Sequence, residues 1–285
     1  MFSGEEYEMA QSVFFDSQII INVSDGVIPA EVWEKVLERL GGKYKYCVSF
    51  TTFMEIVNAL AGGDEHHFEQ NRKRLLVLTN VAECKFLPMP GQFIRTAVLG
   101  LPLERPDFSP EQLQRVWMPV IRQAHDKHDL SSGNVVMMSL PGGIDLTVGL
   151  DLTMLRKQMK DGKELWAEEL RLAKNGEKEM PPAELHATFI LRFDVHAPQT
   201  QENIQRVSRA LDAAHCHLAQ IHHESTKSVY KFDSKLQDWI DNQQLMYLAD
   251  PDLTFVTADR RLIAKLSKSL DRHRVREFTE FAKAI

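Results

Sequence analysis

Both ends of this chain repeat one pattern, in which a short apolar run is followed by a stretch with helical spacing. The runs are Val13–Phe15, Tyr46–Phe50 and Lys85–Leu87 near the N-terminus, and Leu253–Thr257 and Arg274–Phe278 near the C-terminus. Short runs without polar alternation are typical of strands that are covered on both faces, and strands that alternate with helices form parallel sheets. The pattern therefore predicts an α/β fold built on a parallel sheet.

A long middle segment interrupts this pattern. From about Gly91 to Val229 the chain has amphipathic stretches, among them 150–172 and 201–221, which are separated by loops rich in Pro and Gly. The segments 1–90 and 230–285 together have about 146 residues, the size of one ordinary domain. We therefore expect a discontinuous α/β domain, 1–90 and 230–285, that carries a large, mostly α-helical insertion at 91–229.

Composition narrows the class of protein. The net charge of −6, from 40 acidic and 34 basic residues, argues against a protein that coats nucleic acid with a broad basic surface. No run approaches the ~20 apolar residues that cross a bilayer, and residues 1–10 lack the features of a signal peptide. The three cysteines, Cys47, Cys84 and Cys216, lie far apart. These features predict a cytoplasmic protein with no membrane partner.

Four acidic residues are expected to meet at one edge of the sheet. Asp16 directly follows the first strand and Asp259 follows the strand at 253–257, while Glu55 lies in the first helical turn after the second strand and Asp241 on the helix before 253. The carboxyl ends of parallel strands share one edge, where such sheets bind ligands. Crowded carboxylates are tolerated when a divalent cation neutralises them, and oxygen ligands suit Mg²⁺ or Mn²⁺. The sequence thus predicts an acidic Mg²⁺ or Mn²⁺ site.

These motifs resemble those of the PIN domains, a family of metal-dependent nucleases. The matching pieces are Asp16 and Ser17 in "FFDSQ", Glu55 in "SFTTFMEIVNAL", and Asp241, Thr257 and Asp259 in "DNQQLMYLADPDLTFVTADRRL". Their order, their element types and the 18-residue offset from Asp241 to Asp259 are similar to that family. The resemblance covers roughly 1–90 and 230–285.

The resemblance implies a PIN-like three-layer domain and an endoribonuclease that prefers single-stranded RNA. The catalytic and metal-binding residues would be Asp16, Glu55, Asp241 and Asp259, with Thr257 orienting the carboxylates. The bound Mg²⁺ or Mn²⁺ would lower the pKa of water for attack on the phosphodiester. The candidates for contacts with the substrate are Arg260, Arg261 and Ser17. The two arginines are candidates because a guanidinium binds phosphates well.

Other functions stay open at this point. The chain could be an inactive PIN-like scaffold, a nuclease that cuts structured DNA, or a toxin nuclease restrained by an antitoxin. The insertion at 91–229 is far larger than compact PIN domains carry. It could form a lid, a substrate platform, or a surface for a second copy of the chain or another protein.

Simpler structural roles compete with the catalytic ones. Thr52 and Glu55 have the spacing of a capping box, Asp16 could begin a turn, and Asp259 could cap the helix that follows it. Asp241 could lie on a solvated helix face.

Two further sets of residues contain side chains that can bind a metal. Asp238, one helical turn before Asp241, could be the ligand in its place. The histidines at 215, 217, 222 and 223, with Cys216, suggest zinc, but residues 215 and 217 point to different faces of a helix. We therefore expect a structural or surface role for these histidines.

Overall fold

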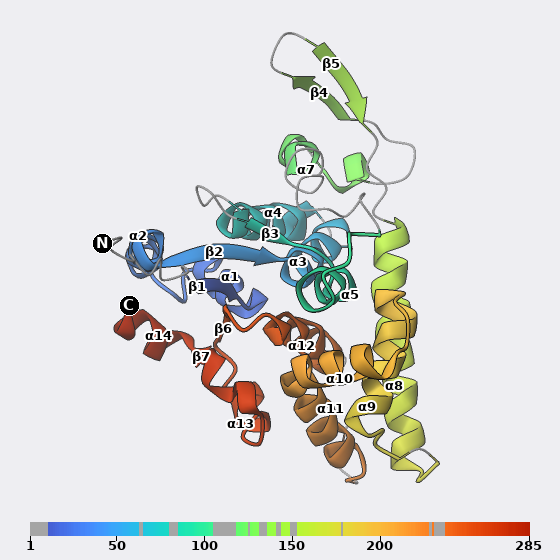
Figure 1. Ribbon diagram of the computed structural model, residues 1–285. Helices are drawn as coiled ribbons and strands as arrows, with labels where there is room; N and C mark the ends of the chain where they lie inside the picture. The colour runs from blue at the N-terminus through green and yellow to red at the C-terminus, as the bar shows by residue number, and fades with distance from the viewer. Residues whose placement is uncertain are drawn as a thin grey trace, which may run out of the picture.

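A computed structural model gives the fold of this chain (Figure 1). It describes residues 11–62, 65–79, 85–104, 118–124, 126–130, 136–140, 144–148, 153–177, 179–227, 230 and 237–285. Five parallel strands form one sheet in the order β3-β2-β1-β6-β7. They are β1 (Gln11–Phe15), β2 (Tyr44–Ser49), β3 (Lys85–Leu87), β6 (Leu253–Thr257) and β7 (Val275–Glu277). The predicted α/β fold with a parallel sheet is confirmed.

Strands from the N-terminal and the C-terminal segments pair at the centre of the sheet. Strand β1 pairs with β2 on one side and with β6 on the other, so that Phe14 lies opposite both Cys47 and Phe255. Phe15 lies opposite Val256 in the same register. The residues that directly follow β1 and β6 therefore emerge side by side at the carboxyl edge of the sheet.

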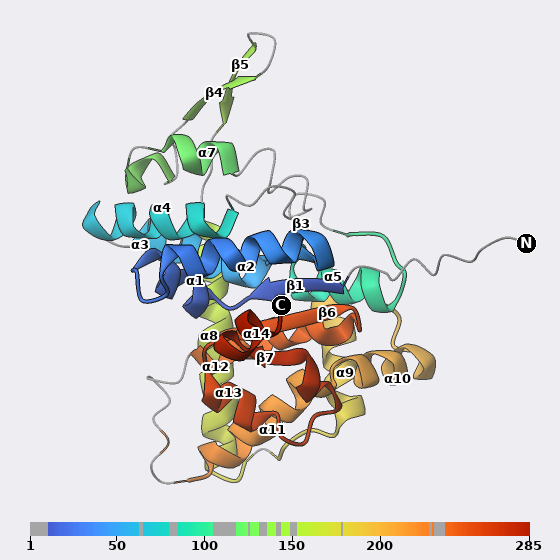
Figure 2. The ribbon, with the colours of Figure 1, turned by 90° about the vertical axis from the view of Figure 1, so that its left-hand side faces the viewer.

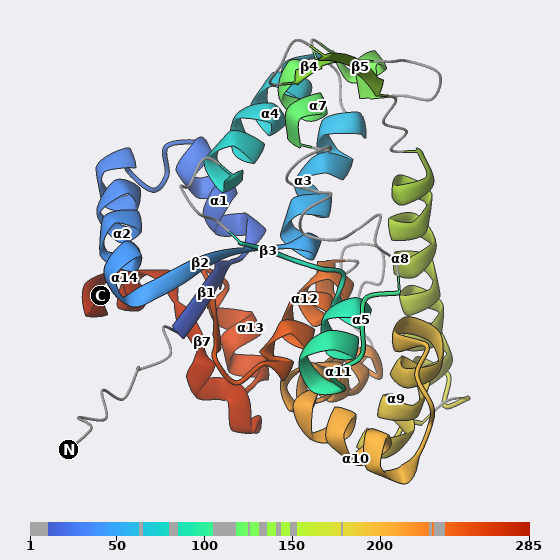
Figure 3. The ribbon, with the colours of Figure 1, turned by 45° about the horizontal axis from the view of Figure 1, so that its top comes forward.

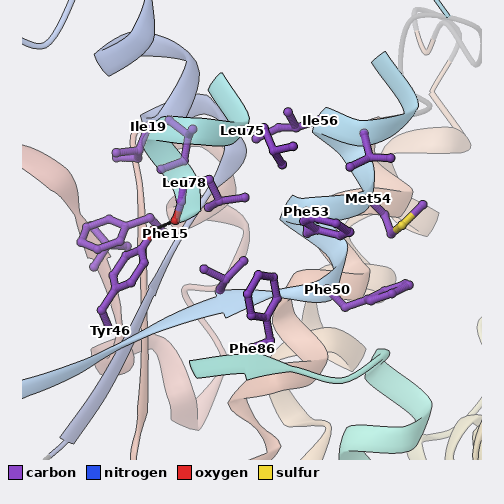
Figure 4. Packing of buried hydrophobic residues seen from close by; sticks show 14 of the residues in the cluster. Phe15, Ile19, Tyr46, Phe50, Phe53, Met54, Ile56, Leu75, Leu78 and Phe86 are labelled. Atoms are coloured by element: carbon purple, nitrogen blue, oxygen red, sulfur yellow. Dashed lines mark hydrogen bonds between the residues drawn. The ribbon is translucent and has the colours of Figure 1, made fainter. Parts of the chain in front are cut away.

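One face of the sheet is covered by helices from both ends of the chain. They are α1 (Ser17–Ser24), α2 (Ala30–Lys43), α3 (Phe50–Gly62), α4 (Glu65–Thr79) and α14 (Phe278–Ala284). Side chains alternate along a strand, so Val13 and Phe15 of β1 point to this face. Figure 4 shows Phe15, Phe53 and Phe86 among the buried residues of this core. Burial on this face thus accounts for the apolar residues of the strands that point toward it.

The other face is covered mainly by helices from the segment 91–229. They are α5 (Pro90–Phe93), the π-helices η1 (Ile94–Val98) and η5 (Leu191–Val195), α9 (Ala183–Ile190), α10 (Gln201–Ala210) and α11 (Asp212–Ser225), joined by η7 (Met246–Ala249) and α13 (Arg260–Lys265). Phe14 of β1 points to this face, where it stacks on Phe255 with ring centroids 4.8 Å apart. The helices of the middle segment therefore share a hydrophobic core with the sheet.

Two further helices border the carboxyl edge of the sheet. Helix α12 (Gln237–Leu245) contacts α3 and α11, and the long helix α8 (Thr153–Lys174) runs along the outside of the molecule beside α11 and α12 (Figures 1 and 3). A side chain at Gly162 of α8 would meet the ring of Trp239 of α12, with an ideal Cβ only 2.7 Å away. Glycine at 162 thus allows α8 to approach α12 closely.

The middle segment also contains an antiparallel hairpin, which the expectation of a mostly helical insertion did not include. Strands β4 (Val136–Leu140) and β5 (Ile144–Val148) pair, and Figures 1 and 2 show them projecting away from the sheet beyond α7 (Met118–Gln123). The sequence signal was present: two five-residue runs rich in apolar residues flank Pro-Gly-Gly, which favours a turn. Short 3₁₀ helices η4 (Lys127–Leu130) and η8 (Leu270–Arg274) complete the described elements.

Three smaller features concern a divided helix, the cysteines and the length of the helices. The helix expected at 201–221 is divided at Leu211 into α10 and α11. Cys216 is a free thiol, Cys47 is buried in the sheet, and Cys84 lies outside the described residues. Among the helices in the described part of the chain, none combines the length and the apolar character needed to cross a membrane.

Candidate metal centre

A cavity of about 830 Å³ lies at the carboxyl ends of β1 and β6. All four acids predicted as metal ligands line it, together with other polar residues: Asp16, Ser17, Gln18, Glu55, Gln220, Glu224, Gln237, Asp238, Asp241, Asp259, Arg261, Lys265 and Ser267. These side chains come from β1 and its following helix, α3, α11, α12 and α13. The parallel register of the sheet thus brings distant segments of the sequence to one place.

Asp16 is held rigidly at the end of β1. Its Oδ2 accepts a hydrogen bond of 2.7 Å from the hydroxyl of Thr257, and its Oδ1 accepts bonds from the Ser17 hydroxyl and the backbone N–H of Gln18. The side chain is buried, since the residue is 6% exposed. The bond from Gln18 caps helix α1, so Asp16 both begins a turn and faces the cavity.

Asp259 has a similar double role at the end of β6. Its Oδ1 accepts the backbone N–H groups of Arg261 and Leu262 at 2.7 and 3.2 Å, which caps α13 as its sequence position allowed. Its own N–H donates to the hydroxyl oxygen of Thr257 at 3.0 Å. Thr257 therefore links the two aspartates through one hydroxyl.

Glu55 does not act as part of a capping box. Helix α3 begins at Phe50, and Thr52 N–H donates to the Ser49 hydroxyl oxygen while the Thr52 hydroxyl donates to the carbonyl of Phe15. The Glu55 side chain instead reaches the cavity, where its Oε1 accepts a hydrogen bond from Gln237. Its Oε2 is buried and has no hydrogen-bond partner among the described residues.

Asp238 and Asp241, one turn apart on α12, have different surroundings. Asp238 accepts hydrogen bonds from the Lys265 ammonium at 2.8 Å and from the Tyr230 hydroxyl at 3.0 Å, so its charge is already compensated. Burial and the carboxylates of Asp16, Asp238, Glu55 and Asp259 raise the pKa of Asp241 to about 8. Asp241 is half-buried and lines the cavity with Asp16, Glu55 and Asp259, so it does not lie on a fully solvated helix face.

The cluster carries more negative charge than its surroundings compensate. Burial raises the pKa of Asp16, although its hydrogen bonds from Thr257, Gln18 and Ser17 act in the opposite direction. Burial also raises the pKa of Glu55, and the charge of Asp16 adds to this effect. Carboxylates so arranged gain stability from protons or from a cation. The all-oxygen donor set and the unpartnered Oε2 of Glu55 fit a hard divalent cation.

The three residues predicted to contact the substrate differ in their exposure to solvent. Arg261 is 85% exposed in its side chain and lines the cavity, and its Nε lies 3.8 Å from Oδ1 of Asp259. Arg260 is also exposed, but it is not among the described residues that line the cavity. Ser17 is 3% exposed and donates to Asp16, so its hydroxyl supports a carboxylate of the cluster.

Two residues of this site were not predicted from the sequence. Lys265, on α13, was not considered, and His217, on α11, was expected to have only a structural or surface role. A ring nitrogen of His217 and one carboxylate oxygen each of Asp238 and Asp241 all lie within 4.8 Å of one another. No spacing rule connects residue 217 to residues 238 and 241, because their proximity depends on how α11 packs against α12.

The chain was compared with known proteins, and no protein-family model, curated protein or solved structure matches it.

Proposed function

We propose that this protein is a metal-dependent phosphodiesterase with a PIN-like three-layer domain, and that it acts as an endoribonuclease on single-stranded RNA. One observation carries the proposal: Asp16, Glu55, Asp241 and Asp259, from four separate segments, line one cavity at the carboxyl edge of a parallel sheet. Such an edge is where open α/β sheets bind their ligands. The motif resemblance to PIN domains supplies the reaction class.

The residues that would hold the cation are these four carboxylates. Mg²⁺ and Mn²⁺ prefer carboxylate oxygens, and the buried Oε2 of Glu55 needs a partner that the described protein atoms do not provide. When bound, such an ion would neutralise charge on a phosphodiester and lower the pKa of water.

The protein's own groups would prepare the site for that ion. Thr257 and Ser17 fix the carboxylate of Asp16, and the helix cap fixes Asp259, so both ligands are oriented before the ion arrives. Preorganised ligands lower the entropic cost of binding. Asp241, with its pKa of about 8, would hold a proton near neutral pH until a cation displaces it.

Cationic side chains at the border of the cavity would bind the RNA backbone. Arg261 projects from the lining with most of its side chain exposed, and the charge of Lys163 on α8 acts on Glu55. A guanidinium can bind a phosphate through two parallel hydrogen bonds. Because α8 belongs to the segment 91–229, we propose that this segment provides part of the substrate platform.

The direct test is to measure cation binding and cleavage with matched variants. Titration calorimetry with Mn²⁺ and Mg²⁺ should detect binding to the parent protein that Asp16→Asn and Asp259→Asn weaken. The same variants should cut single-stranded RNA more than ~100-fold more slowly, since even supporting residues of metal sites contribute 10–100-fold. Asp252→Asn is the control, because Asp252 is exposed at the opposite end of β6 and should leave both properties unchanged.

Other results would select the alternatives. A parent protein that binds no divalent cation would overturn the proposal and favour a scaffold. Faster cutting of flapped duplex DNA than of RNA would favour a structure-specific DNA nuclease. Growth arrest on expression that Asp16→Asn relieves would favour a toxin.

A further inference from the structure

His217 is the least explained polar side chain near the metal centre. It lies on α11 with 0% of its surface exposed, and its Nε2 has no hydrogen-bond partner in the described part of the chain. A buried acceptor or donor without a partner costs free energy, so such atoms normally bind water or a ligand. The position of this nitrogen therefore requires an explanation beyond packing.

The ring of His217 is oriented by its neighbour on α12. Nδ1 lies 3.3 Å from Oδ1 of Asn242, and an amide oxygen can only accept a hydrogen bond. This contact places the ring proton on Nδ1 and leaves the lone pair on Nε2 free. A hydrogen bond of this kind to the second nitrogen is the usual arrangement of histidines that bind metals.

The carboxylates of Asp238 and Asp241 lie within reach of this histidine. One ligand atom from each of the three residues lies within 4.8 Å of the other two, a separation that one ion can span. The geometry therefore offers one imidazole nitrogen and two carboxylate oxygens to a single position.

We propose that His217 is a nitrogen ligand of a divalent cation bound together with Asp241 and Asp238. The inference rests on the metal centre proposed above and specifies its selectivity. Asp241 would connect this position with the carboxylates of Asp16, Glu55 and Asp259, while Lys265 competes with the ion for Asp238. Imidazole nitrogen suits first-row transition metals, for which affinity rises from Mn²⁺ toward Cu²⁺, whereas Mg²⁺ prefers oxygen. The site should thus prefer Mn²⁺ to Mg²⁺.

The experiment is electron spin echo envelope modulation on Mn²⁺ bound to the full chain. The parent protein should show modulation from a directly bound ¹⁴N nucleus, and labelling its histidines with ¹⁵N should replace that pattern. His217→Gln should remove the nitrogen coupling and weaken Mn²⁺ binding ~10-fold or more, while Mg²⁺ binding changes by less than ~3-fold. His223→Gln, on the exposed side of the same helix, should keep the coupling.

The outcomes separate this inference from the proposed function. Mn²⁺ that binds with no histidine nitrogen coupling in the parent, or with coupling that persists in His217→Gln, would overturn the role of His217 and leave the carboxylate site intact. A parent protein that binds no Mn²⁺ would overturn both. Even if His217→Gln folds poorly, the labelled parent still tests the inference, because a bound Mn²⁺ without any histidine nitrogen coupling would overturn it.

Discussion

The hydroxyl of Thr257 donates a hydrogen bond of 2.7 Å to Oδ2 of Asp16, although the two residues are 241 positions apart in sequence. The pairing of β1 with β6 places them at the same edge of the sheet. The same hydroxyl oxygen accepts the backbone N–H of Asp259, so one threonine positions two of the four carboxylates.

Thr257→Val should therefore damage the site without changing the shape of the side chain. It leaves a buried Asp16 oxygen and the Asp259 N–H without this partner, and we expect the free energy of unfolding to fall by ~2 kcal/mol. The hydroxyl also lowers the pKa of Asp16, so its loss should raise that pKa and shift Mn²⁺ binding to higher pH. Urea unfolding and calorimetry at several pH values would measure both effects.

Thr257→Ser is the matched control for that substitution. It removes the methyl group but keeps the hydroxyl, so the pH dependence of Mn²⁺ binding should stay that of the parent. Equal shifts in the valine and serine variants would mean that packing, and not the hydrogen bond, supports Asp16.

Stability should depend on pH in a direction set by Asp241. Its folded pKa of about 8 lies above the unfolded value of about 3.9, so the native state binds the extra proton between these values. The free energy of unfolding of the metal-free protein should then fall as pH rises toward 8. Asp16 and Glu55, whose pKa values are also raised, act in the same direction.

The buried histidines limit the pH range in which the effect of the carboxylates on stability can be measured alone. Burial lowers the pKa of His186 and of His217 to about 4, so their contribution grows from pH 4 to the unfolded value of about 6.5 and is constant above it. Between pH ~6.5 and 8 the carboxylates alone should lower stability, by ~1–2 kcal/mol. Urea unfolding in EDTA would show this slope; Asp241→Asn should flatten it, and saturating Mn²⁺ should reverse it. A flat profile in EDTA would mean that Asp241 is already ionised in the native protein.

Much of this architecture follows from local sequence patterns. The apolar runs at both ends predicted the five strands because strands in a parallel sheet are buried on both faces. The acids Asp16 and Asp259 could be located because they directly follow two such runs. Strand ends in a parallel sheet share an edge, so no knowledge of helix packing was needed to bring them together.

The remaining parts of the site depend on how helices pack, and local patterns do not determine this. His217 and Lys265 reach Asp238 only because α11 and α13 pack against each other and α11 packs against α12. The different surroundings of Asp238 and Asp241 also depend on the position of Lys265, which compensates the former. Likewise, nothing in the periodicity of 183–210 indicated that its helices would cover the sheet.

Breaking the pair of Lys265 and Asp238 should be strongly destabilising. Their side chains are 12% and 7% exposed, and removing one partner of a buried pair leaves an uncompensated charge. We expect Lys265→Met to lower the free energy of unfolding by ~3 kcal/mol at neutral pH. Asp238→Asn in the Lys265→Met background should restore a large part of this loss. A double-mutant cycle with an interaction energy near zero would show that solvent screens the pair.

Two glycines should respond differently to the same substitution. An added Cβ at Gly91 of α5 would lie 2.3 Å from the backbone oxygen of Asp194 in η5, whereas at Gly162 of α8 it would lie 2.7 Å from the Trp239 ring. Alanine normally favours a helix over glycine by ~1 kcal/mol, so both losses must come from these contacts.

A backbone carbonyl moves less easily than a side chain. We therefore expect Gly91→Ala to lower the free energy of unfolding by ~2–3 kcal/mol, and Gly162→Ala to lower it by ~1 kcal/mol. Trp239→Leu should relieve the second clash and not the first, which thermal unfolding of the single and double variants would reveal. If Gly91→Ala were as stable as the parent, α5 and η5 could separate freely, and the middle segment would not be anchored to the sheet at this point.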